Sequence, residues 1–397
     1  MNPPAKLRHP LSVTLLCILA LGAVQTGGSA PTPLYHLYQS MWLLSPVMVT
    51  LIFAMYAIGL LAALLTLGAL SDYMGRRRVI CGSLLVSAVA MATLHGAHSA
   101  TALLSARFVQ GIGTGAAASS IGAMLLDVRG RQAATINSAT AFFGTTLGAA
   151  FSGVLLLYSA SPIASIYGTL FWIFVILAGF ILSVPETAQR RQGVLRALLP
   201  TIFVPLQARR AFLKISFSNI AGWALGGFYL SLMPSVMRSL PGEHSDFINV
   251  IVVAILTLSG CAAILACQSL HAGKLLMAGS FALAAGTGVT LWGVHLASGT
   301  TLLAGTIVAG LGFGANFSGA SRSVFPLAEP HERAGLLSAF YVESYSAFSL
   351  PVILAGLCIP RFGLLDTTYG FGALIVLFAL VSCVITSFTV KVGVRQA

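Results

Sequence analysis

The sequence is short of charge. Lys, Arg, Asp and Glu together make up 8% of the 397 residues, whereas 57% are hydrophobic and the mean hydropathy is +0.94. About a quarter of the residues of a soluble globular protein are charged. So few charges cannot cover a water-facing surface on a chain of this length, and most of the surface must therefore face lipid. The composition excludes an ordinary soluble domain.

Patterns that carry chemistry in enzymes are also missing. No Walker-type phosphate loop, His/Glu metal motif or Ser/His/Asp arrangement can be read in the chain. The six cysteines show no zinc-type spacing and lie in or beside apolar runs, so we interpret them as small, reduced hydrophobic residues. We expect a protein that is not an enzyme and that uses no metal and no bound cofactor.

The charge that is present is mostly positive, with 21 Lys and Arg against 9 Asp and Glu and a formal charge of +12. A nucleic-acid-binding protein gathers such residues on one polar face. Here they fall in short clusters between apolar runs. The pattern excludes nucleic acid as a partner and indicates loops beside a membrane.

Twelve apolar runs are long enough to cross a membrane as helices, which takes about 20 residues each. Strands are not expected, because the runs are too long and lack alternation with period two. The first run, which follows Lys6 and Arg8, also resembles a cleavable secretory signal, but we prefer a retained span because the internal repeat described below needs it. The expected spans are 11–31, 44–67, 79–98, 101–125, 133–157, 163–184, 212–236, 246–268, 273–296, 300–324, 334–358 and 364–389.

The basic residues indicate the orientation. With both termini in the cytoplasm, 18 of the 21 Lys and Arg fall in inner segments, Arg238 and Arg361 fall in outer ones, and Arg107 lies within a span. Cytoplasmic loops of membrane proteins carry such an excess. We therefore expect an integral membrane protein with cytoplasmic N- and C-termini and, from its short outer loops, a bacterial inner (plasma) membrane location.

The most informative stretch lies between the second and third spans: Gly68-Ala69-Leu70-Ser71-Asp72-Tyr73-Met74-Gly75-Arg76-Arg77-Arg78. Its Gly, Leu, Asp, Gly and basic positions resemble the loop signature of the major facilitator superfamily. The resemblance implies an all-α membrane protein with twelve helices in two pseudo-symmetric six-helix bundles. It also implies alternating access around a site between the bundles, powered by a proton gradient.

The same resemblance implies that this loop is a conformational latch. Asp72 would contact the beginning of the eleventh span, near Ala334, in one state and leave it in the other. The alternative is a charged loop that only sets topology. The latch residues expected from the signature and its surroundings are Gly68, Asp72, Gly75, Arg76, Arg77 and Asp127.

The two halves of the chain repeat each other. Residues 111–115 in the fourth span correspond to 310–314 in the tenth, and Arg131 corresponds to Arg333, at offsets of 199 and 202. We expect an N-terminal six-helix bundle, a cytoplasmic basic linker lying on anionic lipid headgroups, and a C-terminal six-helix bundle. Their expected bounds are 1–187, 188–211 and 212–397.

Two charged residues inside apolar runs, Glu343 and Arg107, are candidates for proton coupling. A charge in hydrocarbon costs at least about 2.5 kcal/mol, so both should face the protein interior. Arg107, followed by Gln110 and Gly111, resembles the family's fourth-span signature; the alternative is that it reaches the outer headgroups. Glu343 lies deep in the eleventh span, where apolar surroundings disfavour the charged form and allow a proton to load and leave. The alternative is a neutral acid that hydrogen-bonds a neighbouring helix.

Glycines in the fifth span bear on the direction of transport. Gly144, Gly148 and Gly153 partly match the pattern of antiporter members of the family, but Ala149 stands where a proline is expected. The direction of exchange therefore stays open, and close helix packing through small residues explains the glycines equally well.

Polar and aromatic residues in spans that usually line the family's cavity are the candidates for substrate contact. Taken singly, each also fits ordinary packing or a hydrogen bond between helices. The candidates are Gln25, Asn219, Trp223, Tyr341, Tyr345 and Asn316.

These observations predict a secondary transporter. The preferred function is proton-coupled efflux of small, partly apolar compounds, as in drug:proton antiporters. Uptake of a metabolite is the alternative within transport, and a non-transporting membrane receptor is the alternative of another class. The expected partners are a small-molecule substrate, protons and membrane lipids, and the expected oligomeric state is a monomer.

Overall fold

The computed structural model describes residues 10–188, 193–194, 198–240, 246–329 and 332–394. Every regular element in these ranges is a helix. The long helices are α1 (Pro10–Ser29), α3 (Pro46–Leu67), α5 (Arg76–His95), α6 (Ala100–Arg129), α7 (Ala133–Tyr158), α8 (Pro162–Ile181), α10 (Arg209–Ser231), α12 (Asp246–Ala266), α13 (Ala272–His295), α14 (Gly299–Val324), α15 (Arg333–Phe362) and α16 (Leu364–Val394). The short ones are α2 (Tyr35–Trp42), α4 (Leu70–Met74), α11 (Met233–Ser239) and the 3₁₀ turns η1 (Gly130–Gln132) and η2 (Phe325–Leu327).

Length and hydropathy identify these helices as membrane spans. Nine segments of the described residues meet both criteria alone, and α10 with α11 gives a tenth as one bent span. One of the nine, Ala100–Tyr158, contains both α6 and α7, and α12 contributes the shorter apolar stretch Ile251–Ala266. Each predicted run overlaps one long helix, so the prediction of an all-α membrane protein with twelve spans is confirmed.

The seventh span differs from its predicted form. The sequence predicts one helix over 212–236, but α10 ends at Ser231 and α11 continues at an angle of 58°. Pro234 lies in the first turn of α11. Proline lacks an N–H and its ring crowds the preceding turn, so a helix that meets it bends or starts anew.

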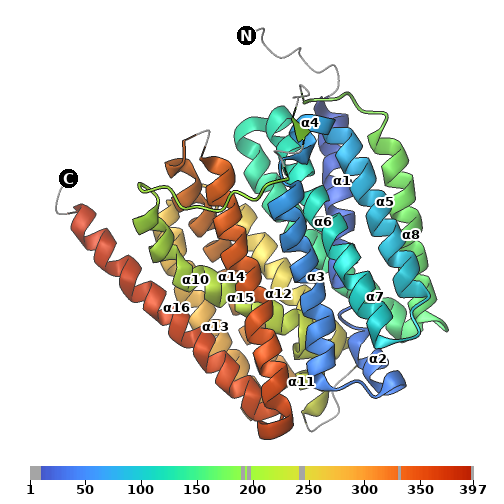
Figure 1. Cartoon of the computed structure of the whole chain (residues 1–397). Helices are drawn as coiled ribbons and strands as arrows, with labels where there is room; N and C mark the ends of the chain where they lie inside the picture. The colour runs from blue at the N-terminus through green and yellow to red at the C-terminus, as the bar shows by residue number, and fades with distance from the viewer. Residues whose placement is uncertain (1–9, 189–192, 195–197, 241–245, 330–331, 395–397) are drawn as a thin grey trace.

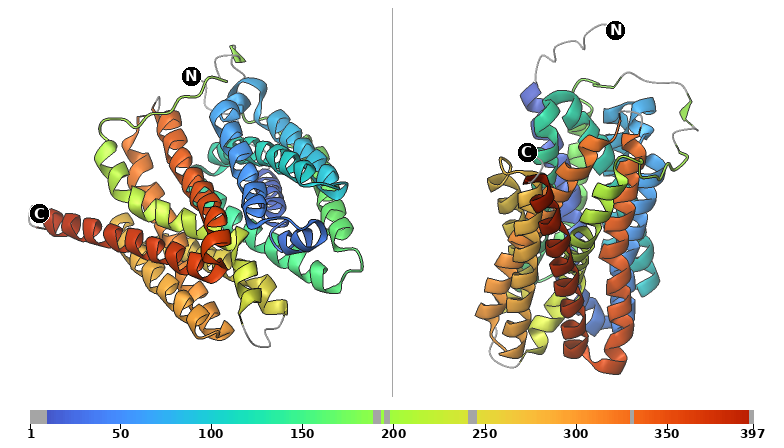
Figure 2. Two further views of the ribbon diagram at one scale, coloured as in Figure 1. Left: turned by 60° about the horizontal axis from the view of Figure 1, so that its bottom comes forward. Right: turned by 90° about the vertical axis from the view of Figure 1, so that its left-hand side faces the viewer.

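The two halves repeat the same plan. Helices α6 and α14 begin 199 residues apart, at Ala100 and Gly299, and each ends in a 3₁₀ turn. Each is also capped by a serine, Ser99 or Ser298, whose hydroxyl accepts a backbone N–H of the first turn. Figures 1 and 2 show α1–α8 on one side of the molecule and α10–α16 on the other.

One end of the bundle carries most of the arginines. Helices α5, α10 and α15 begin there with Arg76, Arg209 and Arg333, and α6 ends there with Arg129. We call this the basic end. The short helix α4 lies at this end, at the top of Figure 1, and α2 and α11 lie at the opposite end.

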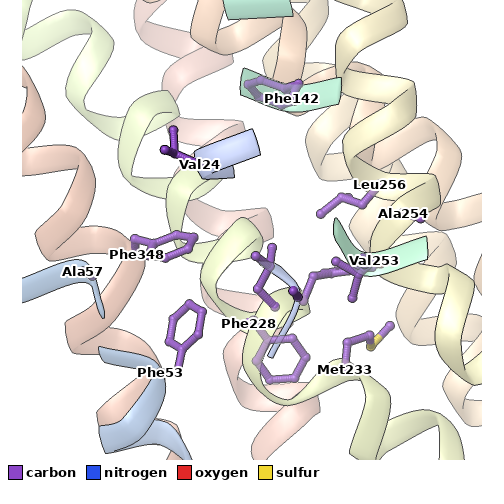
Figure 3. Close-up of a cluster of buried hydrophobic side chains, with 14 of the residues drawn as sticks. Val24, Phe53, Ala57, Phe142, Phe228, Met233, Val253, Ala254, Leu256 and Phe348 are labelled. Carbon is purple, nitrogen blue, oxygen red and sulfur yellow. The ribbon is translucent and has the colours of Figure 1, made fainter. Parts of the chain in front are cut away.

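The halves meet along two pairs of helices, α3 with α15 and α7 with α12. Toward the opposite end, Phe53 of α3 packs against Phe348 of α15, with ring centroids 4.9 Å apart and an angle of 42° between the ring planes. In the second pair, Thr146 and Thr257 share a hydrogen bond of 2.8 Å. Figure 3 shows that the buried cluster between the halves takes Val24 from the first half and Phe228 from the second.

Candidate functional site

Glu343 lies on α15 and faces α10. Its Oε2 accepts a hydrogen bond of 2.6 Å from the Ser216 hydroxyl, and its Oε1 accepts one of 2.8 Å from the Asn219 amide. Both donors are on α10, one turn apart. The carboxyl therefore joins the first and fifth spans of the second half and contacts the helix from which the sequence predicted a substrate contact.

The donors around Glu343 are neutral. Among the described residues the two ion pairs join Arg76 to Asp72 and Asp127, and Glu343 takes part in neither. A carboxylate without a cation keeps its charge only through hydrogen bonds, and burial opposes that charge. Such a group can hold a proton or release it with little rearrangement of other charges.

Asn219 connects the carboxyl to a second hydroxyl. The asparagine is 3% exposed, and its Nδ2 also donates to Ser344 Oγ at 3.0 Å. The structure thus brings together the candidate for proton coupling, Glu343, and a candidate for substrate contact, Asn219. Their positions are 124 residues apart in the chain.

Trp223, one turn beyond Asn219, is the centre of an aromatic cluster. Its ring lies 5.0 Å from Tyr345, 5.7 Å from Phe348 and 6.1 Å from Phe313 and Phe317, between ring centroids. The indole Nε1 has no hydrogen-bond partner among the described residues, although it is buried. Rings from α10, α14 and α15 therefore gather around Trp223, one helical turn from Asn219.

The tyrosines of α15 extend this aromatic cluster. Tyr341 and Tyr345 have ring centroids 6.1 Å apart. From the first half, Phe142 of α7 lies 5.0 Å from Phe313. Three predicted cavity residues, Trp223, Tyr341 and Tyr345, thus belong to one aromatic cluster at the boundary between the halves.

Two other cavity candidates have their contacts elsewhere. Asn316 of α14 is 1% exposed and accepts a hydrogen bond of 3.1 Å from Ser280 of α13, within the second half. Gln25 lies where α1 crosses α7, and its Cβ would be 2.8 Å from a Cβ placed on Gly144. The close approach of these two helices depends on the missing side chain at position 144.

Arg107 is buried inside the first half, with 1% exposure. Its Nη1 donates to the Gly28 carbonyl at 3.1 Å and to the Gln110 side chain, which in turn donates to the Gly27 carbonyl at 2.6 Å. Those carbonyls belong to the last turn of α1, where unpaired C=O groups and the helix dipole favour a cation. The Tyr56 ring lies 4.4 Å from the guanidinium carbon and adds a cation–π contact.

The counter-charge of Arg107 is therefore the end of a helix. Tyr35, in α2 outside the spans, lies beside the guanidinium, but burial raises the pKa of its hydroxyl more than the neighbouring charge lowers it. That hydroxyl stays neutral. Arg107 Nε has no hydrogen-bond partner among the described residues.

The predicted latch residues form a network within the first half. Arg76, the first residue of α5, pairs with Asp72 and lies 3.3 Å from Asp127 Oδ2 at the end of α6. Arg77 donates to the carbonyls of Leu182 and Val184, both at 3.0 Å. Gly75, between α4 and α5, has φ +99°, which side-chain-bearing residues rarely adopt. Gly68, the C-cap of α3, has helical φ and ψ.

Sequence reasoning missed the third acid of this network, Glu186. Its Oε1 accepts the backbone N–H of Arg76 at 2.7 Å and so caps the N-terminus of α5. A Cβ on Gly75 would collide with Glu186 Oε2. The available signal was an acidic residue after the sixth span, at the same end of the bundle as three arginines.

The beginning of α15, where Asp72 was expected to make its contact, is occupied by the linker. The Phe203 N–H donates to the Gly335 carbonyl at 3.4 Å, and a Cβ on Gly335 would collide with the Phe203 ring. Gln207 donates to Glu332 beside it. In the described part of the chain, Asp72 has its ion pair with Arg76 of its own half.

Comparison with known proteins identifies a family and solved structures of similar fold. Residues 14–342 match the sequence model described as Major Facilitator Superfamily. The crystal structure of a mutant of the nucleoside transporter NupG is similar, with a TM-score of 0.72 and 15% identity over 94% of this chain and 99% of that one. Comparison with curated protein sequences gives no match.

Proposed function

The chain belongs to the major facilitator superfamily of membrane transporters, and from this we propose that it exports small, partly apolar compounds in exchange for protons. Neither half contains a nucleotide-binding motif in its sequence, and the proton gradient is the proposed energy source. Transport would proceed by alternating access at the boundary between the halves.

The observation that carries this proposal is the hydrogen bond of 2.8 Å between Asn219 and Glu343. The Glu343 carboxylate accepts a neutral donor there, and an N–H or cationic group of a substrate can take the place of that donor only while Glu343 is ionised. A proton bound to Glu343 removes the charge and weakens the carboxyl as an acceptor. Proton and substrate thus compete for the same carboxylate, and a carrier with such a site exchanges one for the other.

The aromatic cluster supports a ring-containing substrate. Trp223 offers a face and an N–H without a partner among the described residues, next to Tyr345. Indole and phenol side chains combine a large apolar surface with one polar tip. A planar compound with at least one hydrogen-bond acceptor fits this combination.

The proposed location and orientation come from the basic end. Arginines at the ends of α5, α6, α10 and α15 lie together there, and the side of a membrane protein rich in Lys and Arg faces the cytoplasm. We place the basic end in the cytoplasm of a bacterial cell, with the protein acting as a monomer in the inner membrane. The latch network would then belong to the inner gate.

Uptake of a metabolite is the second candidate. It is favoured by the similarity in fold to NupG, which is described as a nucleoside transporter. In that case proton and substrate would move together, and Glu343 would bind its proton before the substrate binds.

Transport by purified protein in liposomes distinguishes these candidates. With the membrane potential clamped, ethidium serves as a planar, partly apolar probe and uridine as a nucleoside. Proton exchange accumulates the probe when the lumen is acidic, whereas co-transport accumulates it when the outside is acidic. Accumulation only with an acidic exterior contradicts export, and wild-type liposomes with no flux of any compound in a wider panel would favour a receptor.

A further inference from the structure

Ser216 stands between two acceptors. Its Oγ lies 2.6 Å from Glu343 Oε2 and 3.0 Å from the backbone carbonyl of Phe212, one turn earlier on α10. A serine hydroxyl has one hydrogen to donate and lone pairs with which to accept. It can therefore donate to only one of these two partners at a time.

We infer that Ser216 is the positioning residue of the proton site: its hydroxyl donates to Glu343 when the acid is ionised and to Phe212 when the acid is protonated. This inference rests on the proposed function of Glu343 as the coupling carboxyl. The serine itself neither gains nor loses a proton. It turns one hydrogen and keeps every polar atom of the site paired in both states.

The hydrogen bonds balance as follows. With Glu343 ionised, Oε2 accepts from Ser216 and Oε1 accepts from Asn219. When a proton binds Oε2, the new O–H donates to Ser216 Oγ, and the serine hydrogen turns to the Phe212 carbonyl. Neither state leaves a buried donor or acceptor unsatisfied, and an unsatisfied group would cost about 1–3 kcal/mol.

The same geometry selects the oxygen that is protonated. Oε1 faces the Asn219 Nδ2, which has only hydrogens to offer. A proton on Oε1 would point at another donor. A proton on Oε2 meets a hydroxyl that can accept, so Oε2 is the proton acceptor.

In the described ranges, the other titratable groups nearby form no ion pair or hydrogen bond with the Glu343 carboxyl. The elements packed around it carry Tyr341, Tyr345 and Arg333 on α15, Lys214 and Arg210 on α10, Arg322 on α14, Asp366 on α16 and Tyr56 on α3. Within the described ranges, hydrogen bonds to the carboxyl come from Ser216 and Asn219, and none of the other groups pairs with it. Ser216 is thus the side chain whose hydrogen bond can change direction when Glu343 gains or loses a proton.

Infrared titration of the purified protein tests this inference without a substrate. The carboxyl C=O band of wild type minus that of Glu343→Gln isolates the Glu343 signal. Ser216→Ala removes the donor to the ionised form, so the midpoint of this titration should move up by about one pH unit. Ser216→Thr keeps a hydroxyl and should return it to the wild-type value.

Ser218→Ala is the matched control, because Ser218 lies on the same helix and donates to the Ile215 carbonyl at 2.8 Å. It should leave the midpoint unchanged. If Ser216→Ala does not fold, Ser216→Cys replaces it, since a thiol is a weak donor and a weak acceptor and should move the midpoint in the same direction. A folded Ser216 variant without a hydroxyl that titrates like wild type overturns the inference.

Ethidium transport separates this inference from the proposed function. If Glu343→Gln abolishes proton-driven accumulation but the Ser216 variants titrate like wild type, the function stands and the role of Ser216 falls. If the midpoint moves as expected but Glu343→Gln still accumulates ethidium against its gradient, the hydroxyl switch stands and the coupling role of Glu343 falls.

Discussion

At the scale of single residues, the two buried charges of the spans are stabilised in different ways. Arg107 meets the carbonyl end of α1 and the face of Tyr56. These partners all belong to the first half. Glu343 meets the Ser216 hydroxyl, which can either donate or accept, and the Asn219 amide N–H₂, which donates. The environment of Arg107 suits a permanent charge, and that of Glu343 suits a charge that comes and goes.

Glu343→Gln tests the second environment. Glutamine resembles the protonated acid in shape and is neutral, so the variant should still bind a substrate and exchange it down its own gradient. It should lose accumulation driven by a pH gradient, because no group at this site can then release a proton. Flux of ethidium in liposomes measures both activities, and near-equal thermal stability with wild type is the control for folding. Full accumulation by the folded variant would place the coupling group elsewhere.

Arg107→Met tests the environment of the permanent charge. It leaves the Gly28 carbonyl and the Gln110 oxygen without their donor, which should lower the free energy of unfolding by about 2 kcal/mol. Arg129→Met is the matched control, because Arg129 also joins α6 to α1, through Thr14, but is less buried. Thermal unfolding in detergent should show the larger loss for Arg107→Met. Normal stability combined with lost proton coupling would instead indicate a direct role in transport.

How far these residues could be predicted depends on the kind of partner each has. The position of Glu343 and Arg107 in apolar runs is enough to single them out in the sequence, because a charged residue there is rare and must be paired. The sequence does not show that Glu343 meets Ser216, since that contact joins residues 127 positions apart. Gln110 could be anticipated as a partner of Arg107 because it follows one turn later, but the Gly28 carbonyl carries no residue identity and leaves no mark in a single sequence.

At the scale of elements, α4 and the loops around it are held by three acids from different parts of the chain. Asp72, Asp127 and Glu186 all contact Arg76, either its side chain or its N–H. Glu186 serves the N-terminus of α5 and Asp127 holds the arginine side chain. Asp72 can therefore leave while the other two keep α5 in place, as an element that acts as a latch requires.

The separate roles of the three acids predict the effect of Asp72→Asn. The change preserves size but removes the charge that pairs with Arg76, so we expect normal expression and a turnover at least about tenfold lower. Asp366→Asn, at the first turn of α16, is the control for a charge change near a helix end. Initial rates of ethidium transport give the comparison. Wild-type turnover of Asp72→Asn would reduce the loop to a topology signal.

Element boundaries show which local rules prevail. The twelve apolar runs follow from the sequence. Proline is a less certain guide: α10 breaks two residues before Pro234, whereas α15 continues through Pro351. Helices inside membranes tolerate proline where neighbouring groups satisfy the freed carbonyls, and that depends on the packing around each site.

At the scale of the whole molecule, the proposed alternating access requires the contact between α3 and α15 to open and close. A Cβ on Gly356 would lie 3.1 Å from the Cβ of Thr50, at the end of the interface away from the latch. In a variant without native cysteines, Thr50→Cys with Gly356→Cys should form a disulfide on oxidation, since bridged Cβ atoms are about 3.8 Å apart. Oxidation should stop transport and reduction should restore it. Continued transport by the cross-linked protein would show that this contact does not need to separate.

Topology is tested with reporter fusions. A fusion after Thr201, between α8 and α10, should report the cytoplasm, and one after Ser99, between α5 and α6, should report the periplasm. The same location for both would contradict the proposed orientation and the number of spans between them.

The offset of about 200 residues between the halves has a consequence for ancestry. It is the mark of an internal duplication, and it allows each functional residue to be compared with its counterpart in the other copy. Counting 199 positions along, as between α6 and α14, Arg107 corresponds to Thr306, and counting back 200, as between α15 and α7, Glu343 corresponds to Phe143. Neither charged residue has a charged counterpart, so the proposed coupling acid belongs to one copy only, and two copies of the first half would lack it.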